Sequence, residues 1–143
     1  MKVPSTILGA ATALSLTIAQ AEAMSAYLWK HRPVVVVAGP GGETAIAEQR
    51  RIFAASRAGL AERDIVVVWV TGNTVSAELG PGPGMTAAQL RARFGAPESG
   101  FRVILVGKDG GTKLSQSSPL GSAILFGTVD AMPMRRDEIR RNR

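Results

Sequence analysis

Three largely apolar runs stand out along the chain, at residues 34–38, 65–70 and 101–106, and Arg102 interrupts the third. A run that is apolar at every position predicts a strand buried on both faces, because a strand with one exposed face alternates polar and apolar residues. Between the first two runs, apolar residues of the segment 43–58 recur at helical spacing, and Gly59 is the expected end of that helix. Strand, helix and strand in this order predict a right-handed parallel βαβ unit.

The segment after the second strand predicts a long loop followed by a short helix. Residues 71–84 end in alternating Gly and Pro, which favours irregular structure. Thr86 and Gln89 have the spacing of a capping box, so a helix is expected to begin there. Gly95 is placed to end this helix in the left-handed conformation that is common at helix C-termini.

The last third of the chain predicts a hairpin and a helical C-terminus. The turn residues KDGGT (108–112) tolerate positive φ and connect the third strand to a half-polar edge strand at 112–117. Residues 120–141 predict helix in two pieces, parted near 127–129. The resulting order β-α-β-α-β-β-α resembles the thioredoxin-like arrangement. That resemblance implies an α/β fold with a four-stranded mixed sheet flanked by helices, its third strand antiparallel to the rest.

Residues 1–23 have the features of an export signal. A minimal positive start is followed by the apolar run 7–18 and by the small-residue motif AEA at 21–23. Cleavage after Ala23 leaves a single domain, residues 24–143, in the periplasm or outside the cell. The alternative is an uncleaved membrane anchor, although the run is shorter than the roughly 20 apolar residues of a spanning helix. Membrane contact is expected only through such a retained signal.

The composition narrows the possible chemistry. The chain has no Cys, which excludes thiol catalysis, CxxC redox chemistry and Cys-zinc sites, so packing alone must hold an exported fold. A net charge of +6 without a nucleic-acid motif argues against sequence-specific nucleic-acid binding. Met132 and Met134 are soft ligands for copper(I), but with His31 as the chain's single His they are expected to fill the core instead. No cofactor and no metal is predicted.

The loop GPGGET (39–44) lies between the first strand and the first helix. A P-loop needs a Lys before its Ser or Thr, and a dinucleotide fingerprint needs a third Gly where Thr44 stands. Two interpretations remain: the loop only turns the chain, or its N–H groups bind an anion at the helix N-terminus. Glu43 favours the first, because its carboxylate competes for the same positive end of the helix.

Four segments carry a family resemblance: LAERDIVVVWV (60–70), ARFGAPESGFRVILVGKDGGTKL (92–114), TVDAMPMRRDEI (128–139) and QRR (49–51). They are similar to the bacterial branch of the DUDES domain family, a thioredoxin-like, peroxiredoxin-related domain of unknown function also found in equarin and sushi-repeat matrix proteins. The resemblance covers nearly all of residues 24–143 and implies no catalytic set. Ser115 departs from it, since a basic residue is expected there. The matching positions are Gln49, Arg63, Asp64, Lys108, Asp109, Lys113, Asp130, Met132, Pro133, Met134, Arg135, Arg136 and Glu138.

Arg135 and Arg136 follow Pro133 closely, so they fall in the first turn of the last helix. Cations there oppose the helix dipole, at a cost of about 0.3–1 kcal/mol. Pairing with Asp130, Glu138 or Asp109 is the expected compensation. Binding of an anion or a partner is the alternative.

These observations predict an exported, non-catalytic domain that binds a protein partner or a small ligand. Ligand sites in open α/β sheets favour the crevice at the strand ends. The expected face therefore lies where the first two strands end and the third begins. Its candidate residues are Gly39, Gly41, Gly42, Pro97 and Gly100.

Two other functions remain open. Arg140, Arg141 and Arg143 could bind lipopolysaccharide or another anionic surface, although cations near a helix C-terminus also complement its dipole. A thiol-independent enzyme would need carboxylates such as Asp64 and Asp130 to converge in a pocket.

Overall fold

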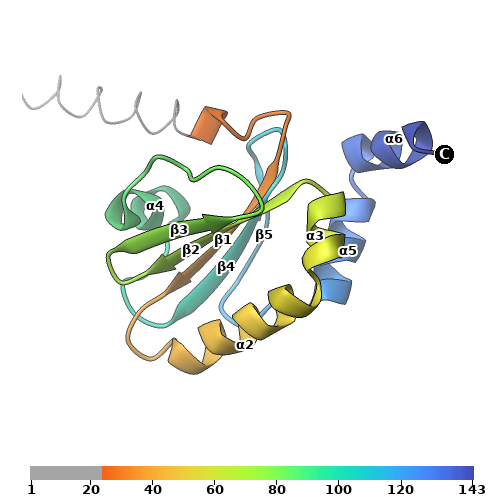
Figure 1. Cartoon of the computed structure of the whole chain (residues 1–143). Coiled ribbons are helices and arrows are strands. Elements are labelled where there is room, and N and C mark those ends of the chain that lie inside the picture. Colours follow the sequence, from red (N-terminus) through yellow and green to blue (C-terminus); the bar gives the residue numbers. More distant parts are fainter. Residues whose placement is uncertain (1–23) are drawn as a thin grey trace, which may run out of the picture.

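The computed structural model describes residues 24–143; the predicted signal peptide, residues 1–23, and its cleavage site after Ala23 lie outside the described residues. Within the described part, five strands form one sheet in the order β3-β2-β1-β4-β5 (Figure 1). β1 and β2 are parallel, and the other neighbouring pairs are antiparallel. The strands are β1 (Arg32–Ala38), β2 (Ile65–Thr71), β3 (Thr74–Glu78), β4 (Phe101–Val106) and β5 (Thr112–Gln116).

The fold is a mixed α/β sheet flanked by helices, as predicted, but the prediction of four strands is wrong. The additional strand, β3, occupies the first part of the segment predicted as a loop. It pairs with β2 through a tight turn that sets Thr71 opposite Thr74, with Gly72 at a φ of 56°. A Gly-Asn pair between two strands is a hairpin signal. The strand was not recognised in the sequence, because the Pro and Gly residues from Gly80 onward predict irregular structure.

The helices also depart from the expected boundaries. They are α2 (Glu43–Ala55), α3 (Arg57–Glu62), α4 (Ala87–Phe94), α5 (Ser122–Asp130) and α6 (Pro133–Arg141). Gly59 does not end a helix but lies inside α3, where a Cβ would come within 2.7 Å of the Phe126 ring. The lack of a side chain at Gly59 therefore permits α3 to approach α5 closely. The break between α5 and α6 falls at residues 131–132 instead of near 127–129, because Pro133 starts a new helix.

The predicted capping box at the start of α4 is confirmed. The hydroxyl of Thr86 accepts a hydrogen bond from the Gln89 N–H at 3.2 Å, and the Gln89 side chain accepts one from the Thr86 N–H at 3.0 Å. Gly95 ends the helix in the left-handed conformation, with a φ of 63°. Local chemistry alone therefore sets both ends of α4.

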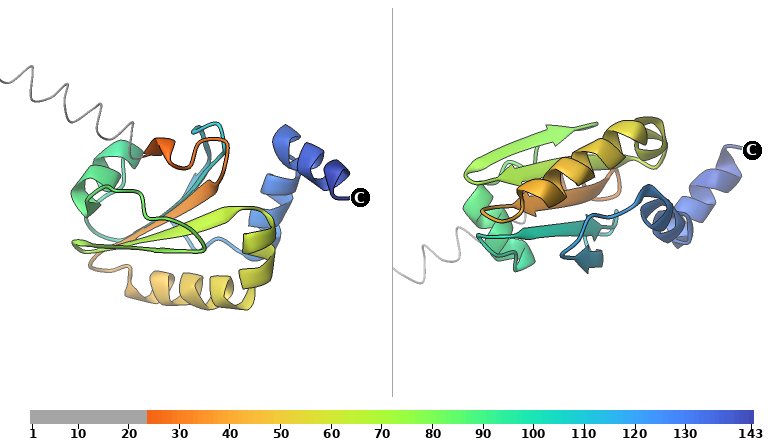
Figure 2. Two further views of the ribbon diagram at one scale, coloured as in Figure 1. Left: turned by 45° about the horizontal axis from the view of Figure 1, so that its top comes forward. Right: turned by 90° about the horizontal axis from the view of Figure 1, so that it is seen from below.

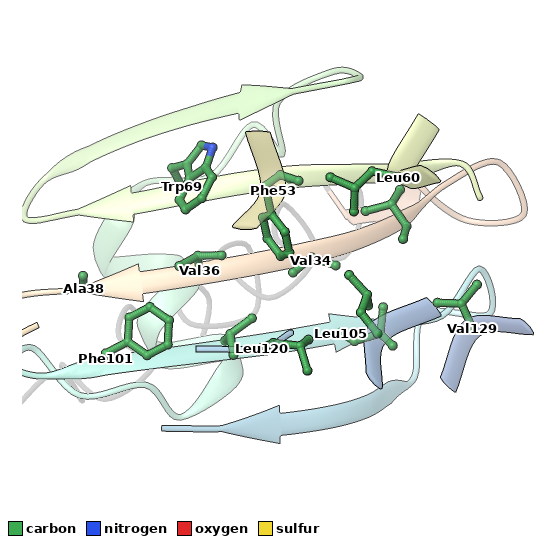
Figure 3. Packing of buried hydrophobic residues seen from close by; sticks show 14 residues of the cluster. Val34, Val36, Ala38, Phe53, Leu60, Trp69, Phe101, Leu105, Leu120 and Val129 are labelled. Atoms are coloured by element: carbon green, nitrogen blue, oxygen red, sulfur yellow. The ribbon is translucent and has the colours of Figure 1, made fainter. Parts of the chain in front are cut away.

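Two apolar layers cover the sheet. On one face, α2, α3 and α5 bury the even-numbered residues of β1, Val34, Val36 and Ala38 (Figure 3). On the opposite face, α4 and the segment before β1 bury the odd-numbered residues, Val35 and Val37 (Figure 2). Burial on both faces explains why β1 is apolar at consecutive positions. No helix among residues 24–143 has the length and apolar character needed to cross a bilayer.

The loop after β1 packs backbone to backbone against the loop before β4. The Gly39 N–H donates to the Gly100 carbonyl at 3.0 Å, and the Gly100 N–H donates to the Pro40 carbonyl at 2.9 Å. A Cβ at Gly39 would lie 1.9 Å from the carbonyl oxygen of Glu98. The glycine permits this close approach, so it has a packing role.

Gly39→Ala is therefore expected to lower the free energy of unfolding by about 1–3 kcal/mol, as overpacking against backbone does. Gly82→Ala is the matched control, because nothing lies within 4 Å of a Cβ built there. Urea denaturation measures both. Equal stability of the two variants would contradict the packing role of Gly39.

Candidate functional site

Charged side chains gather at the end of the sheet where β1 and β2 begin and β4 ends. They come from α3, the strand ends, the β4–β5 turn, α5 and α6. We call them the charge network, defined as Arg32, Glu62, Arg63, Asp64, Lys108, Asp130, Arg135 and Glu138. All of its members except Arg32 and Glu62 are positions of the family resemblance.

Glu138 of α6 binds two buried cations. Its Oε1 accepts hydrogen bonds from Arg32 Nη2 at 3.1 Å and from Lys108 Nζ at 2.7 Å. Arg32 is 0% exposed and Lys108 is 8% exposed, so bulk water cannot replace Glu138 as their partner. Lys108 also donates to Asp64 at 2.8 Å. Glu138 therefore fastens α6 to the start of β1 and to the turn after β4.

Asp130, at the end of α5, organises the other half of the network. Arg63 donates to its two carboxylate oxygens at 3.0 and 2.9 Å, and Arg135 Nε donates to Oδ1 at 3.1 Å. Arg135 also reaches the Glu62 carboxylate at 3.2 Å and lies 3.6 Å from Glu138. The expected pairing of Arg135 with Asp130 and Glu138 is therefore present.

The carboxylates of the network are held in their charged form. Burial disfavours the charge of Glu138, but hydrogen bonds from Arg32 and Lys108 outweigh it, and the pKa of Glu138 is lowered from its ordinary 4.5. The hydrogen bond from Arg63 is the main cause that lowers the pKa of Asp130 from 3.8. Both groups are ionised at neutral pH, so neither is poised to donate a proton there.

Acidification is expected to destabilise the protein below about pH 5. A carboxylate whose pKa is lower in the folded protein contributes stability fully above its unfolded pKa. That stability is lost as the pH falls through the unfolded values, 4.5 for Glu138 and 3.8 for Asp130, toward the folded ones. Urea midpoints measured at about pH 7 and about pH 4 should differ, with the lower midpoint in acid. An equal or higher midpoint at about pH 4 would contradict the stabilising role of these ion pairs.

A groove lies beside the network, between the β4–β5 turn and the junction of α5 with α6. Its volume is about 640 Å³, which falls in the range of small-molecule sites. We call it the Trp29 groove. Its lining is Trp29, Arg32, Gly107, Lys108, Asp109, Lys113, Thr128, Ala131, Met132, Pro133 and Met134.

Trp29 is unusual in both exposure and backbone conformation. It is 63% exposed and has a φ of 66°. The left-handed conformation costs a residue with a Cβ about 1–2 kcal/mol. The Trp29 N–H donates to the carbonyl of Lys108 at 2.7 Å, which holds it there. Strained backbone that presents a large apolar side chain to solvent is typical of functional surfaces.

Most positions of the family resemblance converge on this end of the sheet. Six belong to the charge network, and Lys108 also lines the groove. Asp109, Lys113, Met132, Pro133 and Met134 complete the groove positions. Met132 packs against the core as expected, but the same expectation is wrong for Met134, which is 37% exposed.

Other predicted positions lie apart from the groove. Gln49 is fully buried, and its side chain donates to the Leu120 carbonyl at 2.9 Å and accepts from the Leu120 N–H at 2.7 Å. Arg136 is exposed and makes no ion pair within residues 24–143, so the pairing expected for it with Asp130, Glu138 or Asp109 is wrong. The candidate loop face lies at the other end of β1, about 20 Å from its start at the usual rise of a strand.

Trp29, Arg32 and Glu62 were not predicted as site residues from the sequence. Arg32 could have been recognised from the sequence, because a cation two residues before a run of buried valines needs a counter-charge. The strained backbone of Trp29 depends on its hydrogen bond to the β4–β5 turn, which is distant in sequence.

The arrangement is suited to binding. Within the part of the chain that the structure describes, no group of three or more His, Asp or Glu residues is placed to hold a metal ion. The network carboxylates are bound to cations, and the groove offers apolar side chains next to Arg32, Lys108 and Lys113. A ligand with an apolar part and hydrogen-bond acceptors matches this lining.

The sheet and the groove define a mixed α/β domain with a chemically distinctive surface at the end of the sheet where β1 begins. Its sequence also matches a known family. The chain belongs to the family described as Domain of unknown function (DUF4174), which matches residues 23–138. Neither the curated proteins nor the solved structures contain a match. The resemblance to a domain of unknown function is thus supported, while the DUDES name and the bacterial branch stay predictions.

Proposed function

We propose that this chain is an exported, non-catalytic binding domain and that the Trp29 groove is its ligand site. The observation that carries the proposal is the groove itself, in which a strained, exposed Trp29 lies beside buried Lys108 and Arg32. Backbone strain of this kind clusters at ligand-binding and active sites, which supports a functional role for Trp29. Export rests on the signal-like residues 1–23.

A thioredoxin-like origin is part of the proposal. The order β2-β1-β4-β5, with β1 and β2 parallel and β4 antiparallel to β1, is compatible with that arrangement, and β3 would be an addition at one edge. The loop after β1, where thioredoxin-like enzymes carry reactive thiols, here has no Cys. The binding function would therefore have moved to the opposite end of the sheet.

Trp29→Ala is expected to reduce capture of the ligand about tenfold, as loss of a large aromatic contact does. The measurement is capture from an envelope extract by the immobilised protein, with mass spectrometry of the eluate. Ile124→Ala is the matched control, because Ile124 is 61% exposed on α5 and does not line the groove. Identical eluates from the two variants would contradict the groove as the ligand site.

Binding of an anionic surface remains a second candidate. Arg136, Arg141 and Arg143 are exposed and make no ion pair within the described residues, whereas Arg140 pairs with Asp137. Such binding should weaken steeply between low and high salt. Lipopolysaccharide affinity that is insensitive to salt would remove this candidate.

A thiol-independent enzyme has less support. Asp64 and Asp130 are both engaged by cations of the charge network, Lys108 for the first and Arg63 with Arg135 for the second. Neither lines the Trp29 groove. A pair of free carboxylates facing a cavity would be needed for that function.

A further inference from the structure

We infer that the Trp29 groove takes an anionic amphiphile, a single alkyl chain that ends in a carboxylate. The inference rests on the proposed function, because it names the ligand class of the same groove. Two features of the lining carry it: buried cations with unused donors, and several apolar side chains.

The buried cations of the lining lack acceptors for some of their donors. A Lys ammonium has three donors, and two of those on Lys108 go to Asp64 and Glu138. The Nε of Arg32 is buried and makes no hydrogen bond within the described residues. A buried donor without a hydrogen-bond partner lowers the stability of the fold, and an acceptor that binds it removes this cost. A carboxylate head group beside Lys108 would supply that acceptor.

The charge of the lining also favours an anion. Three cations line the groove against one carboxylate, Asp109. Asp64 and Glu138 offset the remaining two positive charges from outside the lining, so the preference for an anion rests on the cationic donors that line the groove. Lys113 pairs with Asp109 at 2.9 Å, and both side chains are partly exposed. Exposed pairs of this kind are weak, so Lys113 can turn to a ligand carboxylate at little cost.

The rest of the lining suits an alkyl chain. Trp29, Met132, Pro133 and Met134 present ring, thioether and methylene surfaces, and methionine adapts to the shape of its neighbour. The Thr128 hydroxyl is already used, because it donates to the Ile124 carbonyl at 2.7 Å. The groove thus combines cationic and apolar side chains, which matches a molecule with an alkyl chain and a single charged end.

A peptide matches the lining less well. Each backbone N–H that a peptide buries needs an acceptor. Asp109 is the carboxylate of the lining, and its Oδ1 stays engaged by the Gly111 N–H at 3.0 Å even when Lys113 turns to a ligand, which leaves few acceptors for a peptide. The observations therefore favour an alkyl carboxylate.

The test is a titration of the purified protein with three probes that share a ten-carbon chain: decanoate, decyl maltoside and decyltrimethylammonium, each below its micelle concentration. Calorimetry gives the affinities, and tryptophan emission reports the groove, since the other tryptophan, Trp69, is 2% exposed. Decanoate is expected to bind about tenfold or more tightly than the cationic probe and to shift the emission of Trp29.

Two variants test whether the charge of Lys113 contributes to decanoate binding. Lys113→Gln is expected to weaken decanoate binding about two- to fivefold and to leave decyl maltoside binding unchanged. Arg51→Gln is the matched control, because Arg51 also belongs to an exposed ion pair, with Glu48 on α2. Trp29→Ala is expected to weaken every alkyl probe that binds.

Each contrary outcome has a distinct meaning. Equal affinity for decanoate and decyl maltoside would overturn the anionic ligand and leave the proposed function standing. Tighter binding of a short apolar peptide with a free C-terminus would overturn the alkyl chain. If no probe binds, the inference fails, while the proposed function fails only if Trp29→Ala and Ile124→Ala capture the same molecules.

Discussion

Glu138→Gln is expected to lower the free energy of unfolding by about 3–5 kcal/mol, the cost of removing one partner from a buried ion pair. The substitution keeps the shape of the side chain and removes only its charge. Arg32, which is 0% exposed, and Lys108, which is 8% exposed, would then share a neutral amide in place of a carboxylate. Arg32 has no other carboxylate partner within the described residues, and Lys108 keeps only Asp64, so much of their desolvation remains uncompensated.

Asp137→Asn provides the control for Glu138→Gln. Asp137 is the preceding residue of α6, and it pairs with Arg140 on the exposed side of the helix. Its substitution is expected to change the free energy of unfolding by less than about 1 kcal/mol. Urea denaturation of both variants at neutral pH gives the comparison. Similar losses for the two acids would show that burial of the charge network does not stabilise the fold.

Gln49→Leu is expected to cost about 2–5 kcal/mol, because it leaves the N–H and the carbonyl of Leu120 without partners in the core. Gln49 forms both hydrogen bonds itself, at 2.9 and 2.7 Å, and is 0% exposed. The larger apolar surface of Leu cannot offset two buried unsatisfied groups. The segment between β5 and α5 should therefore loosen from α2.

Gln116→Leu is the control for Gln49→Leu. Gln116 also bonds backbone carbonyls, those of Ser118 and Pro119, but it lies on β5 near solvent, and water can replace it. A loss below about 1 kcal/mol is expected there. A loss as large as that of Gln49→Leu, or a small loss for Gln49→Leu itself, would contradict the structural role of Gln49.

The elements that local chemistry sets were predictable from the sequence. β1 and β2 contain long runs of consecutive apolar residues, β4 is apolar except at Arg102, and the capping box of α4 uses side chains three residues apart. β3 was missed because an edge strand needs no apolar run. Its exposure alternates along the strand, and its pairing with β2 decides its conformation.

The candidate site was only partly predictable. The sequence indicated the motif positions and the pairing of Arg135, which depends on residues nearby in the chain. From the sequence, the binding face was expected at the glycine loops. In the structure, however, Gly39 packs against the segment before β4. The Trp29 groove could not be foreseen, because the β4–β5 turn and the α5–α6 junction meet there only after folding.

The charge network and the groove are parts of one arrangement. α6 buries a single residue, Arg135, so ion pairs contribute more to its docking than apolar contacts do. Pro133 and Met134, at the start of α6, line the groove. Variants that break the network are therefore expected to weaken ligand binding as well as stability.

Site-specific photo-crosslinking tests most directly whether binding occurs at this end of the sheet. p-Benzoylphenylalanine is placed in the protein either at Trp29 or at Pro40, an exposed residue of the loop after β1, and the protein is irradiated with an envelope extract. The account predicts adducts from position 29 and none above background from position 40. Adducts from position 40 alone would place the binding site at the glycine loops and contradict it.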